Sequence, residues 1–282
     1  MKSQLYYRAR KIFTNALVHL LLLSVAVTCL FPMLWVVASS FKTQETVFQD
    51  LSLLPKEWHF QNYYRAWHEG GFGRHFLNSL GYTVFVVVGI VIISSMAAYA
   101  FSRLNFPGKN ALFYMFLVAM MIPIPGSFVA LYVLLNKLKL RNTEIGYILA
   151  MINVGLSTSI FLLKTFFDKT PKELEDAARI DGCSKFGIWW HVALPLAKPV
   201  LAVVVVFNAL NVWNEYLLAL LIFDDRLKMP LQVALQRFQG EFVTNYPLLM
   251  AGLTITALPI IILYLLMQKY IVKGVTQGAV VG

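Results

Sequence analysis

The chain has 282 residues, of which 59% are hydrophobic and only 13% are charged. A soluble globular domain carries about 25% charged residues, because water must solvate its surface. A deficit this large excludes an ordinary soluble protein and indicates that lipid solvates much of the surface. The net charge of +10 does not indicate nucleic-acid binding, because the basic residues are scattered over many loops and form no single patch.

Six apolar windows run along the chain, separated by segments that carry almost all of the charge. A helix needs about 20 residues to cross a hydrocarbon layer about 30 Å thick, and each window is long enough. We therefore predict an all-α integral membrane protein with one transmembrane domain over residues 1–282. Its six transmembrane helices are expected at about residues 12–40, 75–101, 110–135, 144–164, 198–222 and 246–268.

The first window follows four basic residues and so has the charge pattern of a secretory signal peptide. Its apolar run is about twice as long as the 7–15 residues of a signal-peptide core, so we interpret it as a retained span. Basic residues close to a span mark its cytoplasmic side. The basic N-terminus therefore predicts that both ends of the chain lie in the cytoplasm. The loop over residues 137–144 is also basic and is a local exception, since this topology places it outside.

The third window contains Pro123 and Pro125. Proline removes a backbone hydrogen bond and clashes with the preceding helical turn, so these residues predict a kink in the third span. We interpret this kink as a feature of the architecture, without a binding role.

The longest inside segment is the loop over residues 165–197, which is predicted to contain two short helices. Thr170 can cap the first helix, and Glu173 would complete a capping box. This helix is expected to continue to about Ile180, and Gly182 to form the turn that ends it. A second helix is expected over residues 185–194, with Ser184 as its cap.

One face of the first loop helix carries small and apolar residues. Leu174, Ala177 and Ala178 have the spacing i, i+3, i+4 and share this face. The alanines would let another protein approach closely, so we predict that the face docks a soluble partner. A helix that lies on lipid favours Lys and Arg on its polar face. This helix instead has acids around one arginine: Glu175, Asp176, Arg179 and Asp181.

Residues 175–182, Glu-Asp-Ala-Ala-Arg-Ile-Asp-Gly, followed by Leu194-Pro195 and Pro199, resemble the EAA loop of ABC-importer permeases. The resemblance is closest to carbohydrate importers with maltose-type permeases. It extends over nearly the whole chain and includes residues 140–143, 213–216 (Trp-Asn-Glu-Tyr), 231–236 (Leu-Gln-Val-Ala-Leu-Gln) and 274–282. The sequence departs from the family in having Asp176 where the motif has glutamate, and in ending Val-Gly where relatives often end Lys-Gly.

This resemblance implies that the loop is a coupling helix seated in a groove of a cytoplasmic ATPase. The coupling residues would be Leu174, Glu175, Asp176, Ala177, Ala178, Asp181 and Gly182. The implied partners are a second homologous permease, an ATPase dimer and an extracytoplasmic solute-binding protein, in the inner membrane of a bacterium or archaeon. ATP and magnesium would bind to the partner ATPase, and this chain is expected to contribute no catalytic residue, cofactor site or metal site.

The fifth window contains polar residues among valines, leucines and phenylalanines. At 100° per residue, Asn208, Asn211 and Glu215 would lie within about 60° of one another on a continuous helix. One interpretation is a wet stripe along the translocation pathway, because polar groups in a membrane usually face protein or water. The other is hydrogen bonding between neighbouring helices. The sequence leaves both open.

A subunit of a secondary transporter or channel is the alternative function. Such proteins usually place several ionisable residues in the membrane, whereas Glu215 is the only Asp, Glu, Lys or Arg in the interior of a predicted span here. This favours an external energy source, and the chain has no Gly-x-x-x-x-Gly-Lys-Ser/Thr loop that would bind ATP phosphates. An intramembrane protease is disfavoured, because Gly155-Leu156-Ser157 is followed by Thr158 and not by glycine.

Two larger segments are expected outside the membrane. By resemblance, residues 224–245 are expected to contact the binding protein. The other segment contains Trp58, Tyr63, Tyr64 and Trp67. These aromatic residues would form an interfacial belt or part of the same docking surface.

Overall fold

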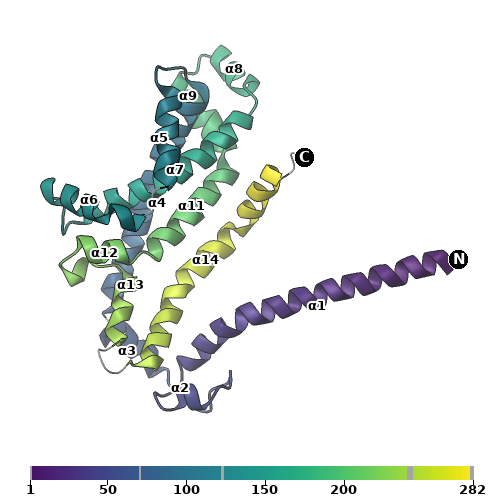
Figure 1. Cartoon of the computed structure of the whole chain (residues 1–282), viewed down its shortest axis with the longest axis vertical. Helices are drawn as coiled ribbons and strands as arrows, with labels where there is room; N and C mark the ends of the chain where they lie inside the picture. The colour runs from purple at the N-terminus through teal and green to yellow at the C-terminus, as the bar shows by residue number, and fades with distance from the viewer. Residues whose placement is uncertain (1, 70, 122–123, 240–243, 280–282) are drawn as a thin grey trace. The chain divides into compact units, whose positions relative to one another are not determined.

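The structure is a computed structural model that describes the chain except for residues 1, 70, 122–123, 240–243 and 280–282. The described residues are helical apart from loops and an isolated bridge between Gln239 and Thr244. The longer helices are α1 (Lys2–Ser39), α3 (Gln61–Glu69), α4 (Phe72–Arg103), α5 (Lys109–Met121), α6 (Ile124–Lys137), α7 (Glu144–Lys169), α8 (Glu173–Ile180), α11 (Lys198–Trp213) and α14 (Tyr246–Ala279). The shorter ones are α2 (Thr46–Gln49), α9 (Lys185–Ile188), η1 (Trp189–Ala193), α10 (Leu194–Leu196), α12 (Leu217–Ile222), η2 (Arg226–Lys228), α13 (Leu231–Ala234) and η3 (Leu235–Phe238). Figure 1 labels most of them.

The chain is an all-helical membrane protein. Among the described residues, four helices are long and apolar enough to cross a membrane: Lys11–Ser39, Phe72–Arg103, Glu144–Lys169 and Tyr246–Lys269. They coincide with the first, second, fourth and sixth predicted windows. A fifth candidate joins Lys185–Leu196 to Lys198–Trp213 across a bend of 79°.

The third predicted window contains α5 and α6, two apolar helices on either side of residues 122–123, which lie outside the described residues. Pro125 is the second described residue of α6. Pro123, the other proline of the predicted kink, lies outside the described residues. The single span predicted over 110–135 therefore stays a prediction.

The fifth predicted window is interrupted. Helix α11 ends at Trp213, and α12 begins at Leu217. Between them, the Glu215 carboxylate accepts hydrogen bonds from the backbone N–H groups of Leu218 (2.6 Å) and Ala219 (3.0 Å). A side chain that satisfies the first N–H groups of a helix caps it. Glu215 therefore starts a new helix where the sequence predicted an uninterrupted one.

The described chain divides into two compact units. Unit 1 comprises residues 1–70 and 237–255, and unit 2 comprises residues 71–236 and 256–282. In unit 1, the amide of Asn62 donates hydrogen bonds to the carbonyls of Ser40 (2.8 Å) and Lys42 (3.0 Å). This buried side chain ties α3 to the segment that follows α1.

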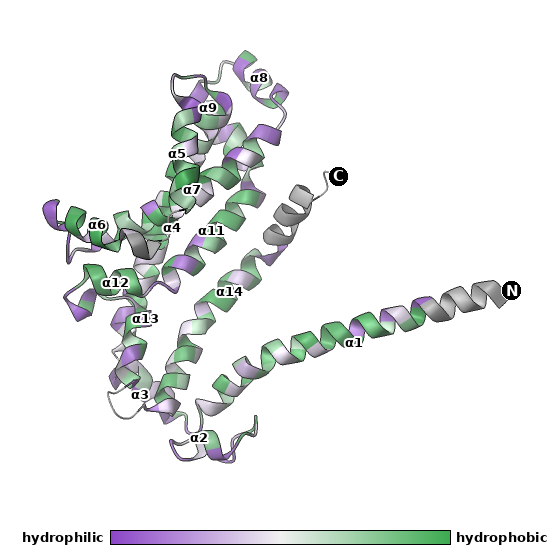
Figure 2. Ribbon diagram, in the orientation of Figure 1, coloured by the Kyte–Doolittle hydropathy of each residue, from purple (hydrophilic) through white to green (hydrophobic). Residues whose placement is uncertain are grey.

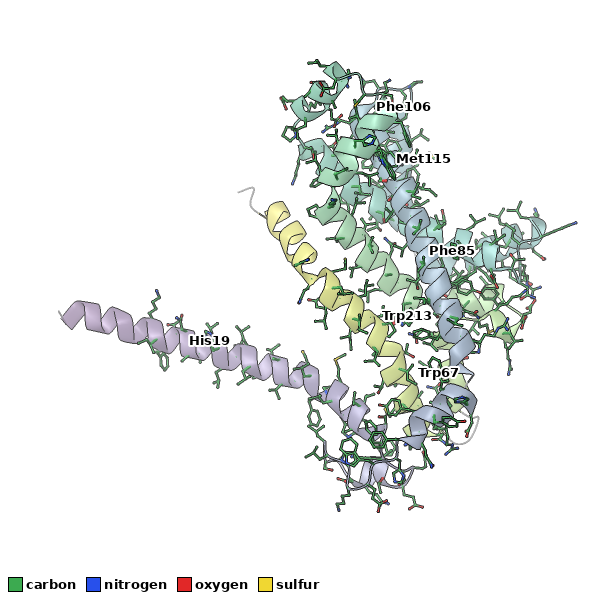
Figure 3. All side chains as sticks on the ribbon, turned by 180° about the vertical axis from the view of Figure 1, so that it is seen from behind. His19, Trp67, Phe85, Phe106, Met115 and Trp213 are labelled. Carbon is green, nitrogen blue, oxygen red and sulfur yellow. The ribbon has the colours of Figure 1, made fainter. Side chains whose placement is uncertain are left out.

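Helix α1 of unit 1 exposes nearly all of its apolar surface. None of the residues in its most hydrophobic window is buried, and Figure 2 shows apolar residues (green) along most of its length. Figure 3 shows side chains projecting all round this helix, His19 among them. A surface of this kind requires lipid or another membrane helix as its surroundings.

The core of unit 2 lies where α4, α7 and α11 run beside one another (Figure 1). The fully buried members Ile90, Tyr147, Ile160 and Leu163 belong to a larger hydrophobic cluster. The outward face of α4 is also apolar, as Phe85 illustrates (Figure 3). Apolar residues on both the packed and the exposed faces are expected for a helix in lipid.

The N-terminal end of α4 holds the segment over residues 227–231. Tyr82 donates a hydrogen bond to the Lys228 carbonyl (2.8 Å), and Asn78 donates one to the Leu227 carbonyl (2.7 Å). Further contacts join Arg74 to Leu227, His75 to Met229 and the Ser79 hydroxyl to the Leu231 N–H. These bonds anchor the segment along two turns of α4.

The basic loop over residues 137–144 is held to the start of the 224–236 segment. Arg141 forms an ion pair with Asp224 (2.5 Å), and the Lys228 ammonium donates to the Asn142 carbonyl (3.0 Å). The Asn142 side chain also accepts from two backbone N–H groups, those of Asp224 and Asp225. Part of the unexpected positive charge in this loop therefore stabilises the fold.

Candidate functional site: the 165–197 loop and the polar residues of α11

The first loop helix begins later than predicted. The Thr170 hydroxyl donates to the Phe166 carbonyl (3.0 Å), so it interacts with the end of α7 and does not cap α8. Helix α8 starts at Glu173, and its N-cap residue Lys172 makes no side-chain cap. The predicted capping box is therefore wrong. The acidic residues of the first turn, Glu173, Glu175 and Asp176, instead complement the positive end of the helix dipole.

The end of α8 confirms the role predicted for Gly182. This residue has φ of +84°, in the left-handed region. The Cys183 N–H donates to the Ala178 carbonyl (3.0 Å), five residues earlier, as in a Schellman motif. Nothing lies within 4 Å of a Cβ added at Gly182. The backbone conformation, and not a lack of space, therefore requires glycine here.

The second loop helix is capped as predicted but continues differently. The Ser184 hydroxyl accepts from the Gly187 N–H (3.1 Å). After α9, the chain forms the π-helical turn η1 and then the short helix α10. The helix predicted over residues 185–194 is therefore present and continues to Leu196, but it contains the wider turn η1 and leads to the bend before α11.

The exposed face of α8 carries Leu174, Ala177 and Ile180. Leu174 is 46% exposed and Ile180 is 87% exposed, although both side chains are apolar and lie outside the candidate spans. Asp176 lies near this face and forms an exposed ion pair with Arg179 (2.6 Å). Figure 2 shows apolar and hydrophilic residues side by side on α8. Asp181 and Gly182 are exposed as well. Such a helix offers an apolar contact surrounded by charge.

Two residues predicted for the same surface face the interior of unit 2. Ala178 is half-buried and packs against the hydrophobic core. Glu175 is buried, and its carboxylate forms an ion pair with Arg103 of α4 (Nε to Oε1, 2.6 Å). The Tyr99 hydroxyl donates to the other oxygen of Glu175 (3.1 Å). Neither side chain is therefore available on the exposed face of this structure.

The three polar residues of the fifth window do not lie along one continuous helix. Asn208 is buried and donates to the Ser159 hydroxyl of α7 (3.0 Å). Asn211 is exposed. Glu215 caps α12 and accepts a hydrogen bond from the Tyr147 hydroxyl (3.3 Å). The three residues thus have different surroundings, and the helical-wheel angle fails for Glu215 because α11 has already ended.

Two sequence segments on which the family resemblance rests lie together in unit 2. The Gln232 amide donates to the Asn214 side chain (3.1 Å), and the Gln236 amide donates to the Tyr216 hydroxyl. The indole N–H of Trp213 donates to the Thr256 carbonyl (2.9 Å). The break between α11 and α12 is therefore held by the segment that follows it in the chain.

Sequence reasoning missed Ile180, Tyr99 and Arg103 as residues of this site. Ile180 lies within the Glu-Asp-Ala-Ala-Arg-Ile-Asp-Gly motif, and its position among charged residues was an available signal. Arg103 ends a long charge-free window, so the sequence indicates only the boundary of a span at this residue. Its partner Glu175 lies 72 residues further along the chain, and no spacing rule connects the two.

Comparison with known proteins identifies the family. Residues 89–277 match the model of the "Binding-protein-dependent transport system inner membrane component" family. The chain is 37% identical over 269 residues to the probable ABC transporter permease protein YurM of Bacillus subtilis, covering 95% of this chain and 89% of that protein. It is 33% identical to the diacetylchitobiose uptake system permease protein NgcG of Streptomyces coelicolor, covering 93% and 88%.

A solved structure also has the same fold. It is the crystal structure of a bacterial ABC transporter involved in the import of the acidic polysaccharide alginate. One of its chains superposes with a TM-score of 0.80 at 27% identity, covering 92% of this chain and 96% of that one. The chain therefore belongs to the inner-membrane components of binding-protein-dependent transport systems, and it is an ABC transporter permease.

Proposed function

We propose that this permease imports a sugar or oligosaccharide and forms half of the translocation pathway. The proposal draws on three relatives. The name of one specifies diacetylchitobiose, that of the second arabinooligosaccharides, and that of the third melibiose, raffinose and stachyose. Its partners are a second homologous permease, a cytoplasmic ATPase dimer and an extracytoplasmic solute-binding protein. ATP and magnesium bind to the ATPase, which supplies the energy.

The exposed face of α8 is the observation that carries the coupling role. Leu174, Ala177 and Ile180 present an apolar contact outside the candidate spans, with Asp176 and Asp181 at its edge. Apolar residues surrounded by polar ones are typical of the centre and rim of a protein interface. Gly182 shapes the turn that ends α8. Glu175 and Ala178 act on the same helix from its inner side.

The proposed topology has six spans and both termini in the cytoplasm. It counts α5 with α6 as the third span, and α11 with α12 as the fifth. Cysteine labelling of intact cells with a membrane-impermeant reagent tests it. Ser52→Cys and Gln239→Cys should react from outside, and Ser184→Cys only after the membrane is opened. Labelling of Ser184→Cys in intact cells would overturn this orientation.

Within the membrane, Asn211 is the residue proposed to line the pathway. It is exposed in this chain, and an exposed amide in a membrane span requires water, substrate or a polar partner. Asn208 and Glu215 are proposed to support the pathway wall, since their hydrogen bonds lie within the chain.

The function is tested with the purified complex in lipid vesicles. Uptake of a labelled oligosaccharide should require the binding protein, ATP and this permease together. Ala177→Trp should reduce the ATP hydrolysis that the substrate-loaded binding protein stimulates. Uptake that continues without ATP, driven by an ion gradient, would support the secondary-transporter alternative and overturn the proposal.

A further inference from the structure

We propose that Arg103 and Tyr99 are positioning residues that fasten the coupling helix α8 to the cytoplasmic end of α4. The two helices would then move as one body when the ATPase changes shape. This inference rests on the proposed function, because it concerns how movement at α8 reaches the membrane spans. It assigns roles to two residues outside the EAA motif and a different role to Glu175.

The fastening is a buried ion pair. The side chains of Arg103 and Glu175 are only 6% and 7% exposed, and their 2.6 Å contact is short even for a charge-assisted hydrogen bond. Tyr99, one helical turn before Arg103, donates to the second carboxylate oxygen. Both oxygens of Glu175 are therefore held from the same helix, which restricts both the position and the rotation of its side chain.

Arg103 also holds the chain that leads into α8. Its terminal nitrogen donates to the Thr170 carbonyl (2.7 Å), while its Nε donates to Glu175. A guanidinium has several donors in one rigid plane, whereas a lysine ammonium is a compact group on a flexible stem. One arginine thus fixes α8 and the turn before it together. Beside it, Ser102 donates to Asp168 near the end of α7 (2.7 Å).

Helix α4 can transmit movement over a long distance. It runs through 32 residues, about 48 Å at 1.5 Å per residue, and has no internal proline. Its other end holds the 227–231 segment through Asn78, Tyr82 and their neighbours. A displacement imposed on α8 would therefore move α4 and, through it, a segment at the opposite end of the bundle.

An ion pair at this position is better suited to orienting α8 than to stabilising the fold. A buried ion pair often contributes little net stability compared with apolar residues of the same volume. Its loss is nevertheless damaging when only one partner is removed, because the other charge stays buried. The directional geometry of the pair would therefore serve to keep α8 in one orientation on α4.

The first test measures coupling in the reconstituted complex. In the complex that assembles, Arg103→Ala and Glu175→Ala should each lower uptake per ATP hydrolysed by about tenfold, a larger loss than that of ATPase yield. The double variant should be no worse than the worse single variant, because both lose the same contact. Glu175→Gln, which keeps an acceptor, should lie in between. The control is Arg65→Ala, which breaks an exposed ion pair with Glu69 in unit 1.

Unchanged uptake per ATP in both single variants would overturn the inference. A parallel loss of ATPase yield and uptake would also overturn it, since that result describes a residue needed for assembly. Additive losses in the double variant would show that the two side chains act separately. Arg103→Lys keeps the positive charge but loses the planar arrangement of N–H donors. Uptake per ATP hydrolysed should therefore be lower in this variant than in the wild type.

A second measurement tests the fastening without any transport. Spin labels at Glu173→Cys on α8 and Val88→Cys on α4, with Cys29 and Cys183 replaced by serine, report the distance between the helices. The distribution should be narrow and the same in every nucleotide state, and Arg103→Ala should broaden it. A broad or nucleotide-dependent distribution in the unsubstituted background would refute the fastening. A narrow one in a complex without ATP-driven uptake would refute the proposed function alone.

Discussion

Asn208 of α11 and Ser159 of α7 are joined by a buried hydrogen bond of 3.0 Å, at a point where the two helices pack closely. The Ser159 hydroxyl donates a hydrogen bond to the Gly155 carbonyl (2.7 Å), and the Asn208 amide also donates to the Val204 carbonyl. Small and polar residues of this kind join helices in membranes, where apolar packing alone distinguishes poorly between helix and lipid.

Gly155→Ala is expected to destabilise the permease at this contact. The new Cβ would lie 2.2 Å from Oδ1 of Asn208 and 2.4 Å from Cδ1 of Ile90, so one of these groups must move. Overpacking of this kind costs about 1–3 kcal/mol. Gly81→Ala is the matched control, because nothing lies within 4 Å of its added Cβ. Thermal unfolding in detergent should show a lower midpoint for Gly155→Ala only, and equal midpoints would contradict the packing described.

Glu215→Leu should lower stability and uptake together. It removes the acceptor for the N–H groups of Leu218 and Ala219 at the start of α12, and the loss of a helix cap costs about 0.5–2 kcal/mol. Glu215→Gln keeps one acceptor oxygen and should retain most of the stability. For each variant, the yield of assembled complex and the initial rate of uptake are measured and compared. Full yield with lost uptake in Glu215→Leu would instead indicate a direct role in transport.

Asn211→Leu should lower uptake without lowering stability. The side chain is exposed, so its replacement should leave yield and thermal stability unchanged while uptake falls several-fold. Asn211→Gln should restore part of the uptake, because it keeps the amide. If Asn211→Leu lowers yield and uptake equally, the residue is a structural contact, for example with the second permease, and does not line the pathway.

Ala177→Trp and Ala178→Trp should separate the two faces of α8. Ala177 is exposed, so a tryptophan there should block a partner while the permease itself remains stable. Ala178 packs against the core, so the same change should destabilise the permease by about 1–3 kcal/mol before any partner is added. Thermal unfolding of the isolated chain and co-purification of the ATPase distinguish these effects. An equal loss of ATPase with equal stability in both variants would refute the assignment of faces.

Gly182→Val should weaken coupling through the backbone. At φ of +84°, a non-glycine residue costs roughly 1–2 kcal/mol, so the turn after α8 should change its conformation. Gly182→Asn is the matched control, because asparagine tolerates the left-handed region better. Stimulated ATP hydrolysis should fall in the valine variant and be largely kept in the asparagine variant. Equal stimulated ATP hydrolysis with glycine, asparagine or valine at position 182 would show that the left-handed turn is not required.

The sequence by itself determined the features that depend on nearby residues or on composition. Charge-free windows predicted the spans of α1, α4, α7 and α14, because exclusion from lipid acts on each charged side chain separately. Gly182 and Ser184 were also predicted correctly, since a left-handed turn and a helix cap depend on a few adjacent residues. The motif at residues 175–182 was sufficient to indicate the family.

Tertiary structure alone decided which way neighbouring polar residues face. Glu175 and Asp176 are adjacent acids about 100° apart on one helix, and sequence could not tell which is buried. Glu175 is the buried one because Arg103 and Tyr99, on a helix distant in the sequence, donate hydrogen bonds to its carboxylate. A carboxylate is tolerated in the interior only where such donors are present. In the same way, Glu215 interrupts a helix that its sequence would continue, because its carboxylate binds the N–H groups of α12 and the hydroxyl of Tyr147.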